Sequence, residues 1–348
     1  MAGYVDSRNQ LATTIILILF SSSLAHANDV DVAEIFNQWI VQHQRVYSTE
    51  VHKQNRFEIF KANWEYVENF KKIGNKTYTL GLNKFSDLSP EEFLKTYTCG
   101  RDPTPTSTHS NSTSTYPHVG MDYLDYEACY ESRDWTEDGY VSPPGDQTPY
   151  CAACWAFTTA AAVEGIAYIK RNSSVQLSVQ QIVDCDKLSN LGCSGGLVTD
   201  AFDYVKRNGG LTSADNYPYD AKDGICNLDK AKQFKASITG FARVPPNDEY
   251  EMIMAVCQQP VAVDIKTTDD FQLYTGGVFS KDCGNGLIDH SMTIVGMGET
   301  DDGVKYWKLK NSWGQDWGEG GYMRMIRGTS KREGHCFINA RASYPIID

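Results

Sequence analysis

The sequence predicts an α+β domain preceded by a small helical unit, and three observations carry this prediction. The chain has 348 residues and a hydrophobic fraction of 41%, which is enough for a buried core. Residues 101–117, RDPTPTSTHSNSTSTYP, are nearly free of apolar side chains and therefore predict an exposed linker. After this linker, helical patterns come first and strand patterns come later, which is typical of an α+β arrangement with two halves.

The segment before the linker has the periodicity of helices. Apolar side chains recur at helical spacing over residues 31–70, with charged residues between them. Residues 81–87, GLNKFSD, predict a strand or a tight connection. Ser89 and Pro90 have the residue types of a helix N-cap and a first helical position, so a further helix is expected from there.

The segment after the linker begins with a helix and ends with strands. The helix is predicted from Cys154, where CWAFTTAAAVEGIAYIK is alanine-rich, free of proline and apolar at helical spacing. Four later runs are short, rich in β-branched or aromatic residues and separated by glycine and aspartate, so they predict antiparallel strands. They are QQPVAVDI, DHSMTIVGMG, VKYWKLKNSW and GYMRMI.

The N-terminus has the features of a secretory signal peptide. The apolar run at 11–20 is too short to span a bilayer, and Ala25, His26 and Ala27 form the small-residue pattern of a signal peptidase site. We therefore expect the secretory pathway, with a vacuole, a lysosome and the exterior as open destinations. Three glycosylation sequons agree with secretion: Asn75, Asn111 and Asn172. The net charge of −12 argues against nucleic acid and anionic membranes as partners.

The stretch YCAACWAF contains two cysteines, Cys151 and Cys154, in a pattern with three physical meanings. A redox dithiol belongs in a βαβ context, and a zinc site needs a second ligand pair at matching spacing. The sequence offers neither of these features. The third meaning is a disulfide cysteine beside a reactive one. Cys154 at a helix N-terminus has its thiolate favoured by the helix dipole, and His290 with Asn311 downstream can supply an imidazole and its orienting amide.

These motifs resemble those of the papain-like cysteine proteases, in their full zymogen form. CAACWAF is similar to the family's cysteine motif, DHSMTIVGMG to its histidine motif and KNSWGQDWGEGGYMR to its asparagine motif, with LSVQQIVDC and GCSGGL in the expected order. The resemblance implies a papain-like two-lobed fold, with a helical left lobe, a β-barrel-like right lobe and a cleft between them. It also implies four segments: a signal peptide at 1–27, an inhibitory propeptide domain at 28–100, a linker with the maturation site at 101–126 and the peptidase domain at 127–348.

The propeptide part of the resemblance is uneven. GLNKFSD matches one propeptide motif in full, whereas the helical ERFNIN motif is partial. Arg56, Phe60 and Asn63 fit this motif, and Val67 replaces an isoleucine conservatively. His52 and Lys71 stand where the motif has glutamate and asparagine. The resemblance implies that this segment lies along the cleft in a non-productive direction and is released at acid pH, when carboxylates such as Asp87 become protonated.

The resemblance also implies a mechanism and no cofactor or metal. Cys154 is the expected nucleophile, His290 its acid–base partner and Asn311 the residue that orients the imidazole, while Trp313 shields their hydrogen bond from water. The Cys154 backbone N–H and the Gln147 amide would hold the oxyanion. Six residues instead of the usual five separate Gln147 from Cys154, and Ala152 replaces a glycine. Either a surface loop absorbs both changes or the oxyanion hole is weakened.

Further residues are implied for substrate binding and for disulfides. Gly195 and Gly196 would bond to the substrate backbone, and five residues would line the main specificity pocket: Leu197, Val198, Asp264, Ile288 and Arg341. The two charges in this pocket would pair, or Arg341 would turn to solvent, which leaves an apolar pocket with some tolerance for acidic side chains. The implied disulfides are Cys151–Cys193, Cys185–Cys226 and Cys283–Cys336. Cys129 and Cys257 remain, either as free thiols or as a fourth bridge.

The expected function is that of a cysteine endopeptidase made as a secretory zymogen. The alternative is a catalytically weak or silent papain-like protein that binds or stores. An exopeptidase is disfavoured because the mature part has no insertion that could block one end of the cleft. The expected partners are protein and peptide substrates, the chain's own propeptide and cystatin-type inhibitors, and the protein is expected to be a monomer.

Overall fold

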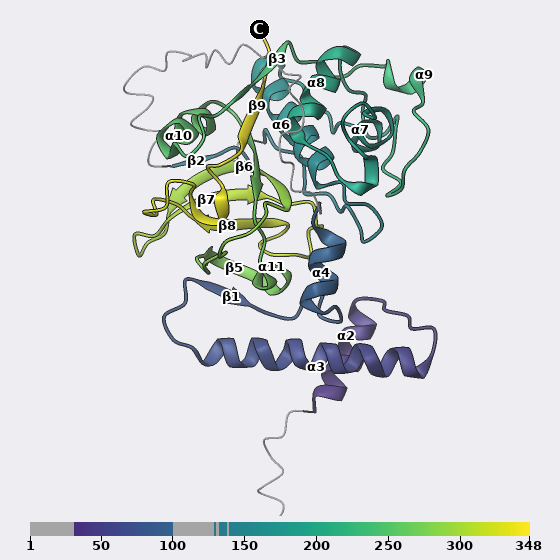
Figure 1. Cartoon of the computed structure of the whole chain (residues 1–348), viewed down its shortest axis with the longest axis vertical. Coiled ribbons are helices and arrows are strands. Elements are labelled where there is room, and N and C mark those ends of the chain that lie inside the picture. The colour runs from purple at the N-terminus through teal and green to yellow at the C-terminus, as the bar shows by residue number, and fades with distance from the viewer. Residues whose placement is uncertain (1–30, 100–128, 130–131, 138) are drawn as a thin grey trace, which may run out of the picture. The chain divides into compact units, whose positions relative to one another are not determined.

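The computed structural model describes residues 31–99, 129, 132–137 and 139–348 (Figure 1). These residues divide into two compact units, 1–61 and 62–348, which are described separately below. The expected signal peptide at 1–27 and the expected linker at 101–126 lie outside the described residues. Among the residues described, none of the helices combines the length and the apolar character that crossing a membrane requires.

The first unit consists of two helical segments joined by aromatic packing. They are α2 (Val32–Gln42), whose N-terminus is capped by Asp31, and the first part of α3 (Glu50–Lys72). The Phe60 ring lies 5.0 Å from that of Phe36 and 5.3 Å from that of Trp39. These rings occupy the apolar positions of the helical pattern, so the predicted helical character of this segment is confirmed.

The second unit begins with the rest of α3 and continues through β1 (Tyr78–Leu80) to α4 (Pro90–Tyr97). The predicted start of α4 is confirmed. The Ser89 side chain accepts the backbone N–H of Glu92 at 3.1 Å, and the Glu92 carboxylate accepts the N–H of Ser89 at 2.9 Å, which forms a capping box. After the strand, residues 81–83 have no regular structure and 84–87 form a turn, so the tight connection is the correct interpretation there.

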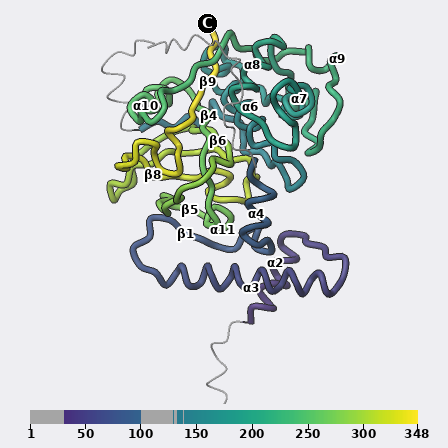
Figure 2. The backbone as a smooth tube through the Cα atoms, viewed as in Figure 1, coloured from purple at the N-terminus to yellow at the C-terminus, as the bar shows by residue number. Residues whose placement is uncertain are grey.

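Helices form one lobe of the part of the chain that follows the expected linker (Figures 1 and 2). They are α6 (Cys154–Arg171), α7 (Val179–Cys185), α8 (Val198–Asn208) and the short α9 (Leu228–Ala231), with the 3₁₀ turn Gly192–Ser194 between α7 and α8. The helix predicted from Cys154 is confirmed. It runs through the core, and a Cβ at Gly165 would meet the ring of Pro260 at 2.5 Å, so glycine is needed for this close packing.

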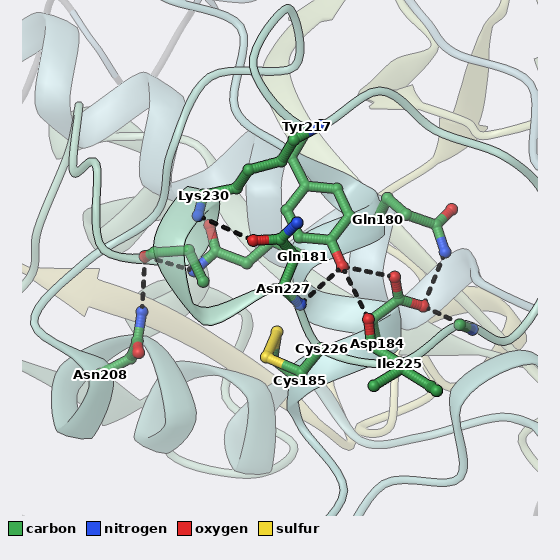
Figure 3. The surroundings of a disulfide bond; sticks show 12 residues. Gln180, Gln181, Asp184, Cys185, Asn208, Tyr217, Ile225, Cys226, Asn227 and Lys230 are labelled. Atoms are coloured by element: carbon green, nitrogen blue, oxygen red, sulfur yellow. Dashed lines mark hydrogen bonds between the residues drawn. A yellow bond between two sulfur atoms is a disulfide. The ribbon is translucent and has the colours of Figure 1, made fainter.

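The Asp184 carboxylate organises the end of this lobe beside the Cys185–Cys226 disulfide (Figure 3). It accepts hydrogen bonds from the Tyr217 hydroxyl at 2.7 Å, from the Gln180 amide at 2.8 Å and from the Gly224 N–H at 2.8 Å. A buried carboxylate that is satisfied in this way joins α7 to the loop that contains Tyr217 and Gly224.

Strands form the other lobe, together with α10 (Glu249–Gln258) and α11 (Asp269–Leu273). The strand order is β1-β5-β8-β7-β6-β4-β9-β3, with β2 paired to β6. The bounds are β2 Arg133–Asp134, β3 Gly240–Arg243, β4 Val261–Ile265, β5 Tyr274–Phe279, β6 His290–Glu299, β7 Lys305–Lys310, β8 Tyr322–Ile326 and β9 Ala342–Ile346, with the 3₁₀ turn His335–Phe337 before β9.

The four predicted strands are β4, β6, β7 and β8, and their pairings are antiparallel as predicted. Two features differ from the expectation. The described strands follow an open path rather than a closed barrel, and β5 pairs with β8 in parallel. This parallel pair is possible because β5 is far from β8 in sequence, so the chain between them can cross over instead of turning back as a hairpin.

Five disulfides connect the described residues. Three are the pairs that the family resemblance implies, Cys151–Cys193, Cys185–Cys226 and Cys283–Cys336. A fourth joins Cys129 to Cys257 on α10, which is the bridge rather than the free-thiol alternative. The fifth joins Cys99 to Cys154 and belongs to the candidate active site.

The Cys129–Cys257 bridge should stabilise the second unit by constraining the unfolded chain. Replacing both cysteines by serine should lower the free energy of unfolding by about 2–4 kcal/mol, because the bridge closes a long loop. The midpoint of thermal unfolding measures this loss, with the unaltered protein as reference. Equal midpoints for the two proteins under non-reducing conditions would contradict a stabilising bridge.

Candidate active site

Cys154 is the first residue of α6, and its side chain is 0% exposed. The preceding N-cap residue, Ala153, provides no side-chain hydrogen bond, so the N-terminus of α6 is not neutralised by a capping side chain. The Cys151–Cys193 disulfide and a 3.0 Å hydrogen bond from the Ala152 N–H to the Cys193 carbonyl fix the turn that leads into the helix. This environment favours a thiolate at Cys154 once the sulfur is free.

His290 and Asn311 come together because β6 and β7 are neighbours. His290 is the first residue of β6, and Asn311 follows the last residue of β7. The distance between His290 Nε2 and Asn311 Oδ1 is 2.8 Å. The Trp313 ring is fully buried and stacks on the imidazole at 4.6 Å between centroids, so it shields this hydrogen bond from water.

The second nitrogen of His290, Nδ1, is buried and makes no hydrogen bond to the described residues. The sulfur of Cys154 and a ring nitrogen of His290 lie within 4.8 Å of each other. An imidazole held at one nitrogen and open at the other is therefore aimed at the cysteine. This arrangement is suited to proton transfer between the two groups.

His290 is neutral in this closed form. Burial lowers its pKa to about 4, and the hydrogen bond with Asn311 only partly opposes this effect. The family mechanism instead expects an imidazolium paired with a thiolate. The difference follows from the state of Cys154: its sulfur is joined to Cys99, so no thiolate is present to stabilise a positive charge on the ring.

Gln147 is fully buried. Its backbone N–H, its backbone carbonyl and its side-chain oxygen each make a hydrogen bond. Its N–H donates to the Ser312 carbonyl at 2.8 Å, its carbonyl accepts from the Tyr219 hydroxyl at 2.9 Å, and its Oε1 accepts from the Ser312 hydroxyl at 2.7 Å. The extra residue before Cys154 is absorbed outside this network, because Thr148 adopts a positive φ and Tyr150 is 81% exposed. The surface-loop interpretation therefore fits this structure.

Residues at the C-terminal end of α4 occupy the centre of the site. The Tyr97 carbonyl accepts hydrogen bonds from Gln147 Nε2 at 3.1 Å and from Trp313 Nε1 at 3.0 Å. Two residues later, the Cys99 N–H donates to the Asp289 carbonyl at 2.6 Å. A substrate could not reach Cys154 while this segment is in place, so the contacts are autoinhibitory.

Cys99 itself was not assigned a role by sequence reasoning. The structure joins it to Cys154, and no free cysteine remains among the described residues. The signal that could have found it is the number of cysteines. The segment 127–348 has nine, an odd number, and Cys99 is the single cysteine of the segment 28–100.

A buried carboxylate, Asp270 on α11, anchors Tyr66 and Tyr78 of the second unit. It is 1% exposed and accepts hydrogen bonds from Tyr66 at 2.5 Å, from Tyr78 at 2.6 Å and from Lys281 at 2.7 Å. Burial, followed by the bond to the Asp270 carboxylate, raises the pKa of Tyr66 to about 12. Sequence reasoning missed this cluster, because its residues are far apart in the chain and belong to no motif.

Two expected substrate-binding glycines lie beside α6. Gly195 has a φ of +105°, which disfavours other residues, and a Cβ at Gly196 would lie 2.6 Å from both Trp155 and Asn190. The next residue, Leu197, exchanges hydrogen bonds with the Asn190 side chain. Glycine is thus required by the backbone conformation at 195 and by the local packing at 196, and both positions are suited to close approach of a substrate backbone.

The expected pocket residues come partly together. Asp264 on β4 donates its N–H to the Arg341 carbonyl at 3.0 Å and accepts the hydroxyl of Ser291 on β6 at 2.7 Å. Burial raises the pKa of Asp264, whereas Ser291 and the charge of Arg341 oppose this effect. The side chains of Leu197 and Ile288 are half-buried, and Val198 is buried at the start of α8.

Comparisons with known proteins agree with this geometry. The sequence profile of the "Papain family cysteine protease" matches residues 129–346, and that of the "Cathepsin propeptide inhibitor domain" matches residues 36–93. Vignain of Vigna mungo is 42% identical over 345 residues, which cover 97% of this chain and 92% of vignain. Fruit bromelain of Ananas comosus is 40% identical over 312 residues, covering 90% and 86% of the two chains.

Solved structures show the same relationship. A recombinant stem bromelain precursor is 39% identical, with a TM-score of 0.83 and coverage of 92% of this chain and 100% of that one. The proform of the ragweed pollen allergen Amb a 11 is 35% identical, with a TM-score of 0.81 and coverage of 91% and 95%. By sequence and by fold, the chain belongs to the papain family of cysteine proteases and carries that family's propeptide inhibitor domain.

Proposed function

We propose that this protein is a cysteine endopeptidase whose site consists of Cys154, His290 and Asn311. The single observation that carries the proposal is the orientation of the imidazole. Its Nε2 is held by Asn311, and its buried Nδ1 has no hydrogen bond among the described residues and is left for Cys154. A structural histidine would satisfy both nitrogens, so the open one supports a role in proton transfer.

In the proposed reaction the Cys154 thiolate attacks the scissile carbonyl, and His290 in its imidazolium form protonates the leaving amine. Water then hydrolyses the acyl-enzyme, with neutral His290 as general base. The oxyanion is held by the Cys154 N–H and by Gln147 Nε2, which in the zymogen binds the Tyr97 carbonyl. That contact supports the proposed role, because the amide already binds a carbonyl oxygen in the closed form.

The alternative, a papain-like protein that binds or stores without cleaving, is less consistent with the site. The extra residue before Cys154 was the feature that favoured it, and Gln147 is nevertheless held in place by Ser312 and Tyr219. The chain keeps the residue types and the contacts that turnover requires. We therefore place endopeptidase activity first.

Replacing Cys154 by alanine should abolish peptide cleavage by the processed protein. Loss of the nucleophile should lower kcat by about four orders of magnitude or more, because the remaining groups act as a unit with it. Hydrolysis of a fluorogenic peptide measures this. The control is the Cys129→Ser, Cys257→Ser protein. It has lost two cysteines outside the site and should stay active. Residual activity of a tenth or more in the alanine variant would make the nucleophile assignment wrong.

We also propose that the protein follows the secretory pathway to a vacuole, a lysosome or the exterior. Disulfides connecting all the described cysteines are consistent with an oxidising compartment. Two of the sequons, Asn75 and Asn172, are exposed and adopt positive φ angles, so both are available for glycosylation, while Asn111 lies outside the described residues. Cystatin-type inhibitors and a monomeric state remain proposals from the family resemblance.

Acid should open the zymogen in part through His290. The closed form holds this residue neutral with a pKa near 4, whereas a solvated histidine has a pKa of about 6.5. Between these values the open form binds more protons than the closed form, so lowering the pH favours opening. The effect starts below pH 6.5 and levels off near pH 4.

The thermal unfolding midpoint of the Cys154→Ser zymogen, which cannot process itself, measures this dependence. The midpoint should fall as the pH is lowered from 7 to 4, with a contribution from His290 of at most about 3 kcal/mol. In the Cys154→Ser, His290→Gln protein the fall should be smaller, because glutamine does not titrate. An equal fall in both variants would show that other groups carry the pH dependence.

We propose that Leu197, Val198 and Ile288 select aliphatic or aromatic side chains at the second position before the scissile bond. Asp264 and Arg341 are adjacent through a backbone hydrogen bond, and Arg341 partly stabilises the Asp264 charge. Their charges would largely cancel within the pocket. Asp264 is also held in place by the hydroxyl of Ser291.

Two reciprocal variants test this pocket with a positional substrate library. Asp264→Ala removes the negative charge and should shift the preference toward acidic side chains by about tenfold, as one partner of a buried pair is left uncompensated. Arg341→Ala should shift it toward basic side chains. If the unaltered enzyme strongly prefers arginine or lysine, or if neither variant changes the profile, the pocket is assigned wrongly.

A further inference from the structure

Cys99 is the last described residue before the expected linker, and its side chain lies against that of Cys154. The structure pairs the two cysteines with each other, and their Cα atoms are 6.3 Å apart. This separation lies in the range of about 4.4–6.8 Å that disulfides normally span. Cys99 is 6% exposed and Cys154 is fully buried, so both sulfurs are enclosed together.

Hydrogen bonds from two separate segments hold Cys99 in this position. Before α6, the Gln147 side chain donates to the carbonyl two residues before Cys99, at Tyr97. From the strand lobe, the Asp289 carbonyl, directly before His290, accepts the N–H of Cys99 itself. The capping box of α4 fixes the other end of the segment. The backbone on both sides of the site therefore determines where the Cys99 sulfur lies.

Because the other cysteines pair with one another, Cys99 and Cys154 have only each other as disulfide partners. Eight of the nine cysteines in residues 127–348 form four bridges with one another, and the ninth is Cys154. Residues 28–100 contain one cysteine, Cys99. In an oxidising compartment two adjacent thiols with no other partner are expected to become a disulfide.

We propose that a disulfide between Cys99 and Cys154 closes the zymogen covalently, so that a thiol reductant is needed to release the nucleophile. The inference rests on the proposed role of Cys154. It adds a condition to the non-covalent inhibition by the propeptide: opening the cleft alone leaves the sulfur of Cys154 bonded and unable to attack a carbonyl. Activation would thus depend on the redox conditions at the destination as well as on pH.

The chemistry is thiol–disulfide exchange in both directions. On closing, the two cysteine thiols react with a low-molecular-weight disulfide such as oxidised glutathione, which takes up two electrons and two protons and leaves as two thiols. On opening, one thiolate of the reductant attacks a sulfur of the bridge and forms a mixed disulfide. A second thiol then resolves it, which releases the oxidised reductant and restores both cysteines.

The site favours attack at the Cys99 sulfur. Cys154 would leave as a thiolate at the N-terminus of α6 with His290 beside it, and the sulfur that is more stable as a thiolate is the better leaving group. The reductant's substituent would then remain on the propeptide cysteine. The nucleophile would be released directly in its reactive form.

A metal ion is the rival occupant of this cluster. One ligand atom each of Cys99, Cys154 and His290 lies within 4.8 Å of the others, and two thiolates with an imidazole are ligands that suit zinc. The rival predicts a zymogen with both thiols reduced and with zinc bound in equal amount. It predicts release by a chelator rather than by a reductant.

The first experiment counts thiols in the full-length zymogen, secreted and purified without reductant. After denaturation, iodoacetamide should label no cysteine in the unaltered protein and one in Cys99→Ser, at Cys154. A non-reducing peptide map should contain the peptides of Cys99 and Cys154 linked to each other. Two labelled thiols in the unaltered zymogen, with or without bound zinc, would overturn the proposal.

The second experiment follows activation at acid pH with and without dithiothreitol, read out with an epoxide thiol trap and a peptide substrate. The unaltered zymogen should show at least about tenfold less activity without reductant, whereas Cys99→Ser should be equally active in both conditions. The Cys129→Ser, Cys257→Ser protein is the matched control and should still need the reductant. If Cys99→Ser needs it to the same extent, the lock is not at Cys99.

The two experiments separate this inference from the proposed function. If Cys154 is not the nucleophile, the reduced and processed Cys154→Ala protein stays active, whatever the thiol count shows. If only the lock is absent, that variant is inactive, but the unaltered zymogen activates equally well without reductant. A chelator that replaces dithiothreitol in activating the zymogen would assign the cluster to a metal and reject the disulfide.

Discussion

The burial of α6 against the strand lobe is the constraint on which the site depends. Thirteen of its eighteen residues are buried, so the helix cannot shift without disturbing the hydrophobic core around it. Gly165 allows the Pro260 ring to touch the helix backbone, and the Thr293 hydroxyl on β6 reaches the Thr158 carbonyl at 3.5 Å. Since Cys154 begins α6 and His290 begins β6, this packing sets the distance between them.

A buried ion pair supports the same region from behind. Glu164 on α6 lies 4.0 Å from the amine of Lys310, which directly precedes Asn311. The Glu164 carboxylate also accepts hydrogen bonds from the Ser142 hydroxyl and from the Leu177 N–H. Burial raises the pKa of Glu164 and lowers that of Lys310, and each charge partly offsets this effect in the other. Losing one partner would therefore leave an uncompensated charge beside Asn311.

Much of this arrangement could be predicted from the sequence, because its motifs lie at the ends of regular elements. The helix from Cys154, the strand containing His290 and the capping box at Ser89 each have a local signal of periodicity or capping. These signals fix where an element begins, and the order of the motifs indicates the family and hence how the elements meet.

The remaining features depend on contacts between distant parts of the chain. The parallel pairing of β5 with β8, the convergence of Tyr66 and Tyr78 on Asp270 and the meeting of Cys99 with Cys154 have no signal in local sequence. The neutral state of His290 was also beyond prediction, because it arises from burial in the closed form rather than from residue type.

The Tyr97 carbonyl has a consequence for the activated enzyme. This carbonyl accepts hydrogen bonds from both the Gln147 amide and the buried Trp313 indole. When the propeptide departs, both donors therefore lose their acceptor. Leaving a buried donor unsatisfied costs about 1–3 kcal/mol, so water is expected to enter beside the indole. Each substrate must then displace that water to place its own carbonyl there. The hydration of the emptied site, rather than its shape alone, thus sets part of the cost of binding.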